Sequence, residues 1–136
     1  MNYLQQDPYG MYRSLSHQGP GPFLMGANTL IGNEVYNLEE DHLGEVKEIM
    51  LDTGDGSVAY AVLSFGGVLG MGDKLFAVPW NALKLDTENK RFVLDVDKDR
   101  LKDAPGFDKN AWPSMADKRW GSAVHDYYGT RPYWDH

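Results

Sequence analysis

The stretch from Val58 to Trp80 constrains the fold most, because it places two apolar runs on either side of a glycine-rich loop. The first run, Val58 to Phe65, is almost continuously apolar, which predicts a strand buried on both faces or nearly so. The second run, Lys74 to Val78, stops at Pro79. Because proline cannot donate a hydrogen bond to a sheet, we expect this strand to end there, at an edge or corner.

Other segments with a β pattern surround these two runs. We expect strands over residues 30–36 and 43–51, and a hairpin formed by residues 83–86 and 92–96. Residues 52–57 are glycines and short polar side chains, which tolerate the positive φ of a tight turn and predict a reversal of the chain there. Five or six short strands with turns between them and no intervening helix indicate a small barrel or sandwich.

The segment before the strands has a different composition. Residues 1–28 are rich in Gln, Gly, Pro and Ser, and Gly and Pro prevent regular helix or ladder formation, so we predict a flexible arm. The alternative is that the arm docks somewhere through its aromatic side chains, which are Tyr3, Tyr9, Tyr12 and Phe23.

The segment after the strands has a helical pattern. Residues 97–103 predict a short helix, and Ser114 is a suitable N-cap for a second helix over residues 115–128. Gly129 is well placed to end that helix in the left-handed conformation. Apolar residues recur at helical spacing and should form one face, which consists of Ala116, Trp120, Val124 and Tyr127.

Three short motifs accompany the glycine loop: Leu30-Ile31-Gly32, Leu43-Gly44-Glu45-Val46 and Val78-Pro79-Trp80. Together they resemble the PRC-barrel family over about residues 29–97. That family includes the cytoplasmic part of the H subunit of photosynthetic reaction centres and the C-terminal domain of a ribosome-maturation factor. The resemblance implies a mainly β fold, a small PRC-type β-barrel of about six strands. The fold identity would rest on Gly32, Gly44, Gly66, Gly67, Gly70, Gly72, Pro79 and Trp80.

This resemblance divides the chain into three parts. We expect a flexible N-terminal arm (1–28), a PRC-barrel domain (29–97) and a helical, aromatic-rich C-terminal extension (98–136). Members of the family act mainly as non-catalytic modules that bind proteins or regulate an assembly.

Charge and cysteine content exclude several function classes. The net charge is −7, and residues 29–100 hold 14 acidic and 7 basic side chains, so the whole excess lies on the predicted barrel. Nucleic-acid binding relies on Lys and Arg, so we expect no nucleic-acid partner.

The absence of cysteine excludes disulfides, thiolate catalysis and Cys-type zinc sites. No secretion signal is visible and no apolar run approaches the roughly 20 residues of a membrane span, so we expect a cytoplasmic protein.

The motifs that could carry chemistry each fail on spacing. In the glycine loop Asp73 precedes the lysine and Leu75 stands where a phosphate-binding loop has Ser or Thr, so a structural turn is favoured. Residues 52–63 do not fit a calcium loop. The acidic residues 39–41 beside His42 could bind a divalent ion weakly, but a solvated turn is the favoured alternative. We therefore expect no cofactor, no metal and no catalytic residue.

The aromatic residues of the extension remain as the candidate interaction site, because Trp and Tyr dominate protein interfaces. The alternative is that they complete the core of a barrel too small to be stable alone. These residues are Trp112, Trp120, Tyr127, Tyr128, Tyr133 and Trp134.

The leading hypothesis is a non-catalytic interaction or regulatory module that forms a homodimer and binds a protein partner. One rival is an assembly or maturation factor for a ribonucleoprotein or photosynthetic complex. Another is a small-molecule sensor, although so small a barrel is normally filled by side chains.

Overall fold

A computed structural model describes residues 24–65 and 74–135 of the chain. The predictions for residues 1–23 of the arm and for the glycine loop at 66–73, with Gly66, Gly67, Gly70 and Gly72, lie outside the described residues.

Within the described residues, seven strands form one sheet in the order β5-β6-β1-β2-β3-β4-β7. Neighbouring strands are antiparallel except β1 and β6, which are parallel. The strands are β1 (Glu34–Tyr36), β2 (His42–Asp52), β3 (Ser57–Ser64), β4 (Lys74–Pro79), β5 (Leu83–Asp86), β6 (Arg91–Leu94) and β7 (Phe107–Asp108). The helices are α1 (Ala27–Leu30), the 3-10 turn η2 (Trp80–Ala82), α2 (Lys98–Lys102) and α3 (Lys118–Tyr128).

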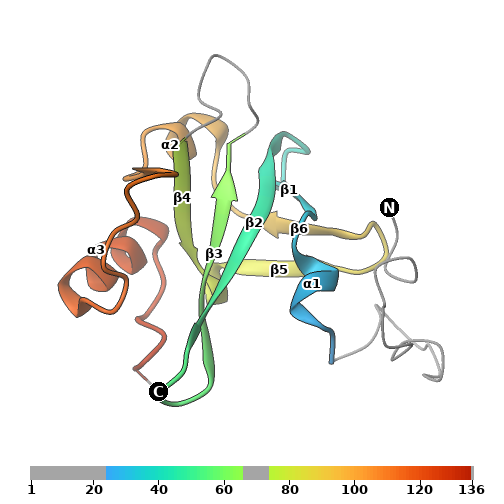
Figure 1. The fold of residues 1–136 in the computed structure, drawn as a ribbon. Helices are drawn as coiled ribbons and strands as arrows, with labels where there is room; N and C mark the ends of the chain where they lie inside the picture. The colour runs from blue at the N-terminus through green and yellow to red at the C-terminus, as the bar shows by residue number, and fades with distance from the viewer. Residues whose placement is uncertain (1–23, 66–73, 136) are drawn as a thin grey trace.

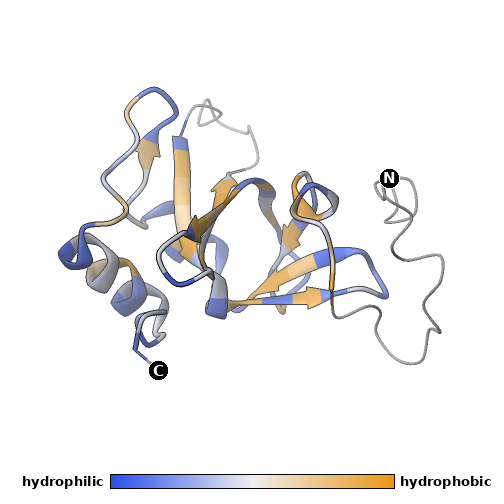
Figure 2. Ribbon diagram, turned by 60° about the horizontal axis from the view of Figure 1, so that its bottom comes forward, coloured by the Kyte–Doolittle hydropathy of each residue, from blue (hydrophilic) through white to orange (hydrophobic). Residues whose placement is uncertain are grey.

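The sheet is strongly bent, so that β5 and β6 cross the direction of β2, β3 and β4 (Figure 1). Strand β2 is long, and its pairing with β3 shifts register between Val46 and Glu48 and again between Met50 and Leu51. Such bulges increase the local twist and let one strand take part in two differently oriented halves of a sheet. The bend encloses an apolar core, and Figure 2 shows that apolar residues are concentrated in the strands.

Strands β3 and β4 contribute side chains to two separate clusters. Leu63 and Phe76 point into the bend and belong to the inner cluster, together with Val35, Leu43, Val46, Phe92 and Leu94. Tyr60 and Ala77 belong to an outer cluster that also contains Val124 of α3. Successive side chains of a strand face opposite sides of a sheet, so both faces of β3 and β4 are covered. The prediction of two-sided burial for residues 58–65 is confirmed.

The mainly β fold with a C-terminal helix is confirmed, and the part of the chain that the structure describes has seven strands where about six were expected. The seventh, β7, is a two-residue strand on the outer side of β4 that the sequence pattern did not indicate. No ladder among the described residues joins β5 to β7, so the barrel is partly open. Strand β4 ends at Pro79, as expected, and η2 turns the chain into the β5–β6 hairpin.

Two predicted boundaries are wrong. The first strand does not begin at Leu30, because residues 27–30 form a helical turn closed by a hydrogen bond from the Ile31 N–H to the Ala27 carbonyl. The second helix begins at Lys118, not at Met115, because Asp117 is the N-cap and its carboxylate accepts from the Arg119 N–H. Ala116 therefore lies before the helix, exposed to solvent. Gly129 ends the helix in the left-handed conformation, as expected, with φ of 71°.

Gly44 of β2 allows a close approach between two strands. Its φ is 153°, and a Cβ atom built there would lie 2.0 Å from the backbone oxygen of Ser64 in β3. No side chain fits in this space, because the obstructing atom belongs to the backbone. Gly32 also has a positive φ (94°). It differs from Gly44 because a Cβ atom built there would meet nothing within 4 Å.

We therefore expect Gly44→Ala to destabilise the fold much more than Gly32→Ala. Gly32→Ala should cost about 1 kcal/mol from backbone strain alone. Gly44→Ala adds a backbone clash and should cost at least about 3 kcal/mol. Urea unfolding followed by tryptophan fluorescence measures both, and equal losses would show that the contact with Ser64 has no special role.

Candidate functional site

The C-terminal extension folds back over the outer face of the sheet, and Figure 1 shows α3 beside β4. Val124 is 5% exposed and packs against Tyr60 and Ala77. The Trp120 ring lies edge-on to the Tyr60 ring, with 5.3 Å between their centroids. At Gly121 the helix approaches so closely that a Cβ atom would lie 2.6 Å from the Tyr60 hydroxyl. The predicted apolar face of this helix therefore covers the chain's own sheet.

A fully buried histidine holds the end of the chain against this helix. His125 Nδ1 lies 2.7 Å from the Gly121 carbonyl oxygen, which only accepts, so Nδ1 carries the proton and donates. Nε2 then accepts from the Tyr133 N–H at 3.1 Å. With one nitrogen donating and the other accepting, the imidazole is neutral. No pattern in the sequence indicates a role for this histidine. In the structure it positions Tyr133.

Tyr133 in turn connects the extension to the β2–β3 hairpin. Its hydroxyl donates to Asp52 Oδ2 at 2.7 Å, across 81 residues of sequence. This hydrogen bond, with help from the Gly54 N–H, lowers the pKa of Asp52. Burial, and secondly the same hydrogen bond, raises the pKa of Tyr133 to about 12. The pair therefore favours the ionised carboxylate and the neutral phenol at neutral pH.

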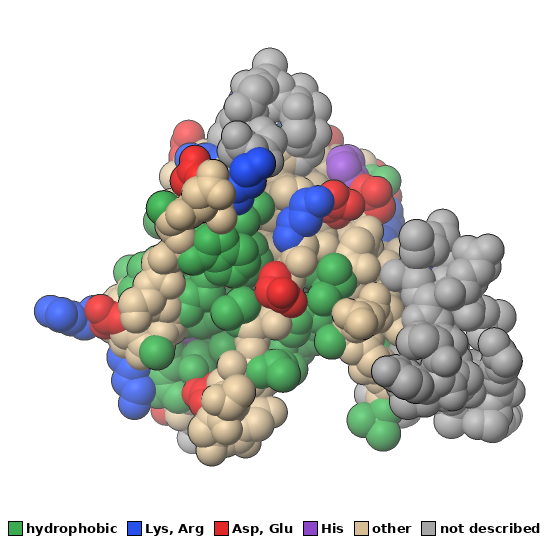
Figure 3. Space-filling model, viewed as in Figure 1, with side chains coloured by type: hydrophobic (Ala, Val, Ile, Leu, Met, Phe, Trp, Pro, Cys, Tyr) green, Lys and Arg blue, Asp and Glu red, His purple; other side chains and the backbone are tan. Residues whose placement is uncertain are grey.

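An open cleft of about 560 Å³ lies between the hairpin and the extension. Leu51 of β2 is 58% exposed and Trp112 is 43% exposed at this cleft, although both are large apolar side chains. Figure 3 shows hydrophobic side chains gathered between the C-terminal segment and β2. The lining residues are Met50, Leu51, Asp52, Thr53, Ala59, Tyr60, Trp112, Pro113, Ser114, Met115, Ala116, Lys118, Tyr133 and Trp134.

The cleft also carries polar groups. The Tyr60 side chain is 1% exposed, and its hydroxyl has no hydrogen-bond partner among the described residues. Burial raises the pKa of this phenol, so it is a neutral donor. The Lys118 ammonium lies 5.7 Å from the centre of the Trp134 ring. We call the cleft formed by these lining residues, Leu51 and Trp112 included, the aromatic cleft.

The six aromatic residues proposed as an interaction site do not form one surface. Trp112, Tyr133 and Trp134 line the aromatic cleft. Trp120 is half-buried against Tyr60 and lies outside the lining. Tyr127 and Tyr128 lie at the other end of α3, where the Tyr127 hydroxyl donates to the Arg100 carbonyl and the Arg100 guanidinium stacks 4.4 Å from the Tyr127 ring. Tyr127 therefore attaches the end of α3 to α2, and Tyr128 packs against both the inner and the outer cluster.

Sequence reasoning missed three residues of the site. Tyr60 was hidden in an apolar run, Asp52 in a turn motif, and Leu51 at the end of a predicted strand. Tyr60 and Asp52 meet the extension through Trp120 and Tyr133, which are distant in sequence. The one local signal was Leu51 itself, because a leucine beside a polar turn is often exposed.

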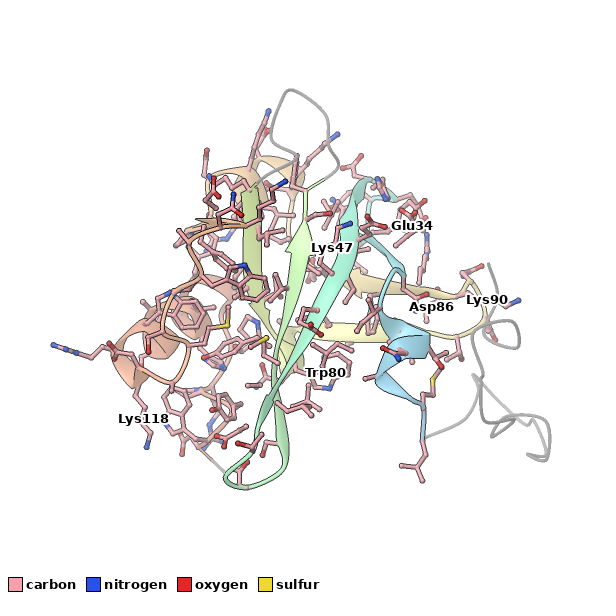
Figure 4. The ribbon with its side chains drawn as sticks, in the orientation of Figure 1. Glu34, Lys47, Trp80, Asp86, Lys90 and Lys118 are labelled. Carbon is pink, nitrogen blue, oxygen red and sulfur yellow. The ribbon has the colours of Figure 1, made fainter. Side chains whose placement is uncertain are left out.

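The other side of the molecule is polar and acidic, with Glu34, Asp86 and Lys90 opposite Lys118 in Figure 4. Arg91 links two turns there. Its guanidinium donates two hydrogen bonds to Glu40, at 2.6 and 2.9 Å, and a longer one to Asp86 at 3.4 Å. The hydrogen bond from Arg91 lowers the pKa of Glu40. The part of the chain that the structure describes holds no group of three His, Asp or Glu side chains close enough to bind a metal ion.

The model of the PRC-barrel domain matches residues 24–101. The chain belongs to the PRC-barrel family. No curated protein matches the sequence. The match ends before Trp112, so the half of the cleft that the extension provides is additional to the family's domain. Among the helices described, none combines the length and apolar character that a bilayer crossing requires.

The Asp52–Tyr133 contact predicts a pH-dependent stability. The pKa of Asp52 is lower in the folded state than in the unfolded state. Its contribution to the free energy of unfolding is therefore present above the unfolded pKa of about 3.9 and is lost as the pH falls through the folded pKa. The folded pKa of Tyr133 is raised, so its contribution is present below about 10 and is lost as the pH rises towards 12.

Tyr133→Phe should therefore lower the melting temperature most between about pH 5 and 9. The difference from the wild type should shrink below about pH 4 and above about pH 10. Thermal melts across this range measure it, and Tyr36→Phe is the control, since the Tyr36 ring lies on β1 beside Arg91 and makes no contact with Asp52. A difference that stays constant with pH would contradict the role of the Asp52 carboxylate.

Proposed function

We propose that this protein is a non-catalytic interaction module that binds a segment of a protein partner in the aromatic cleft. The observation that carries the proposal is that two exposed large apolar residues, Leu51 of the sheet and Trp112 of the extension, line the same cleft. Large apolar side chains that remain in water beside a concave surface mark interaction sites. The membership in a family of interaction modules supports the same function.

The chemistry of the cleft suits an apolar or aromatic protein segment. Trp112, Tyr133 and Trp134 supply large ring surfaces, which are the side chains that contribute most to protein interfaces. Lys118 and Asp52 place one charge of each sign at the cleft. This mixture favours a segment of low net charge.

The rival functions have less support. The inner cluster fills the space inside the bend with side chains, which argues against a small-molecule sensor that uses the barrel interior. The net charge of −7 argues against direct binding to nucleic acid, so a role in a ribonucleoprotein or photosynthetic assembly would act through a protein component. A chain without cysteine suits the reducing cytoplasm, where we place the protein.

We expect substitutions in the cleft to remove partner binding without unfolding the protein. The tagged full chain, used for affinity capture with mass spectrometry, should retain a partner that both Trp112→Ala and Leu51→Asp lose. Removing such an aromatic anchor costs about 2 kcal/mol or more, or roughly thirtyfold in affinity.

Leu38→Asp is the matched control, since Leu38 is 65% exposed but lies in the β1–β2 turn, away from the cleft. A partner retained equally by all three variants would place the binding site elsewhere on the protein.

The proposal includes a homodimer with two-fold symmetry. Strand β5 is the end of the sheet, and no described strand pairs with its outer side. If two copies pair antiparallel about Leu85, Lys84 of one copy faces Asp86 of the other, so the edge is complementary in charge to itself.

Light scattering should therefore give twice the chain mass of 15.3 kDa. Lys84→Asp should give the monomer mass, because it places like charges opposite each other, whereas Lys98→Asp on α2 should leave the dimer intact. A wild-type mass of one chain would refute the dimer.

A further inference from the structure

The aromatic cleft has a candidate occupant within the same chain. Residues 1–23 precede the described residues and carry only two charged side chains, Asp7 and Arg13. Among the first nine residues are Met1, Tyr3, Leu4 and Tyr9, which match the apolar and aromatic lining of the cleft. The chain leaves the described fold at Leu24, which is 83% exposed.

The length of this segment is sufficient to reach the cleft. A domain of about 100 residues has a radius of gyration of about 13 Å, so an equivalent sphere is about 33 Å across and about 52 Å around half its circumference. An extended chain covers about 3.3 Å per residue, so roughly 10 to 16 residues span the surface between α1 and the cleft. Of the 23 residues before Leu24, about the first nine then remain to lie in the cleft.

The charges are also compatible. Asp7 is the only charged side chain among residues 1–12. Lys118 lies over the Trp134 ring at the cleft, and among the described residues no carboxylate lies within ion-pair distance of its ammonium. A segment with one carboxylate between two aromatic residues can therefore pair with Lys118 while Tyr3, Leu4 and Tyr9 contact the rings.

We propose that residues 1–9 dock in the aromatic cleft of the same chain and compete there with the protein partner. This inference rests on the proposed function, because it assumes that the cleft binds protein segments. A tethered segment has an effective concentration in the millimolar range, so even weak contacts keep it bound until a partner with higher affinity displaces it. The arm would then act as an intramolecular inhibitor that covers Leu51 and Trp112 in the absence of a partner.

The chain offers an unusually direct test, because it contains no cysteine and four tryptophans. The variant Gln6→Cys in the full chain carries a single nitroxide label, and the label broadens the NMR signals of nearby protons. The indole N–H signals of Trp112 and Trp134 report on the cleft. Trp80 is an internal control, since it packs on the inner cluster against Phe92.

We expect the signals of Trp112 and Trp134 to lose most of their intensity while the Trp80 signal keeps it. The broadening should disappear when Tyr3→Ala and Leu4→Ala are added, and remain when Gln5→Ala is added. A label at Glu88→Cys, in the β5–β6 turn on the other side of the molecule, should leave the cleft signals unchanged (Figure 4).

Two outcomes overturn the inference. One is equal intensity at all four indoles with the label at residue 6, which shows that the arm does not occupy the cleft. The other is broadening that persists when labelled protein without ¹⁵N is mixed with unlabelled ¹⁵N protein, which shows that the arm comes from a second copy.

The proposed function can be judged separately. Partner capture that depends on Trp112 and Leu51 supports the proposed function even if the arm does not dock. If the arm docks, the variant with Tyr3→Ala and Leu4→Ala should bind the partner more tightly than the wild type, because the arm no longer competes for the cleft.

Discussion

The burial of β3 on both faces is the constraint on which the rest of the structure depends. Its inward side chains, Ala61 and Leu63, belong to the inner cluster, and Tyr60 on the outward side belongs to the outer cluster. A small bent sheet buries only its concave face by itself, which leaves a domain of this size marginally stable. The C-terminal extension supplies the second cover, so it is part of the fold although the family match ends at residue 101.

Local pattern predicted the strands well where burial and turn chemistry agree. Strands β2, β3 and β4 were placed correctly, because alternating or continuous apolar residues end at glycine-rich turns or at Pro79. Leu30 and Ile31 were misplaced in a strand, since their apolar character reflects packing of α1 on the inner cluster and not a strand pattern. Ser114 and Asp117 are both good N-caps, and the sequence alone does not choose between them.

The candidate site was only partly predictable for a related reason. An excess of aromatic residues after Phe107 is visible in the sequence, and three of the six proposed residues line the cleft. Which of them remain accessible depends on contacts such as Tyr133 with Asp52 and Tyr133 with His125. The first of these joins residues 81 positions apart, and no local periodicity encodes such a pair. Tyr127 carries the same sequence signal as Trp134 but packs beside Arg100 of α2 instead, and Tyr128 packs against the two apolar clusters.

For the proposed function, the contacts that stabilise the extension would also fix the shape of the cleft in advance. Trp112 is held by a hydrogen bond from its indole N–H to the Lys109 carbonyl at 2.8 Å and by the Phe107 ring at 5.2 Å. Its exposed face is therefore fixed before any partner arrives. A side chain that is already ordered loses little conformational entropy on binding, so more of its contact energy contributes to affinity. Tyr133 is fixed in the same way by Asp52 and His125, so the proposed recognition would use side chains that the same few polar contacts already hold in place.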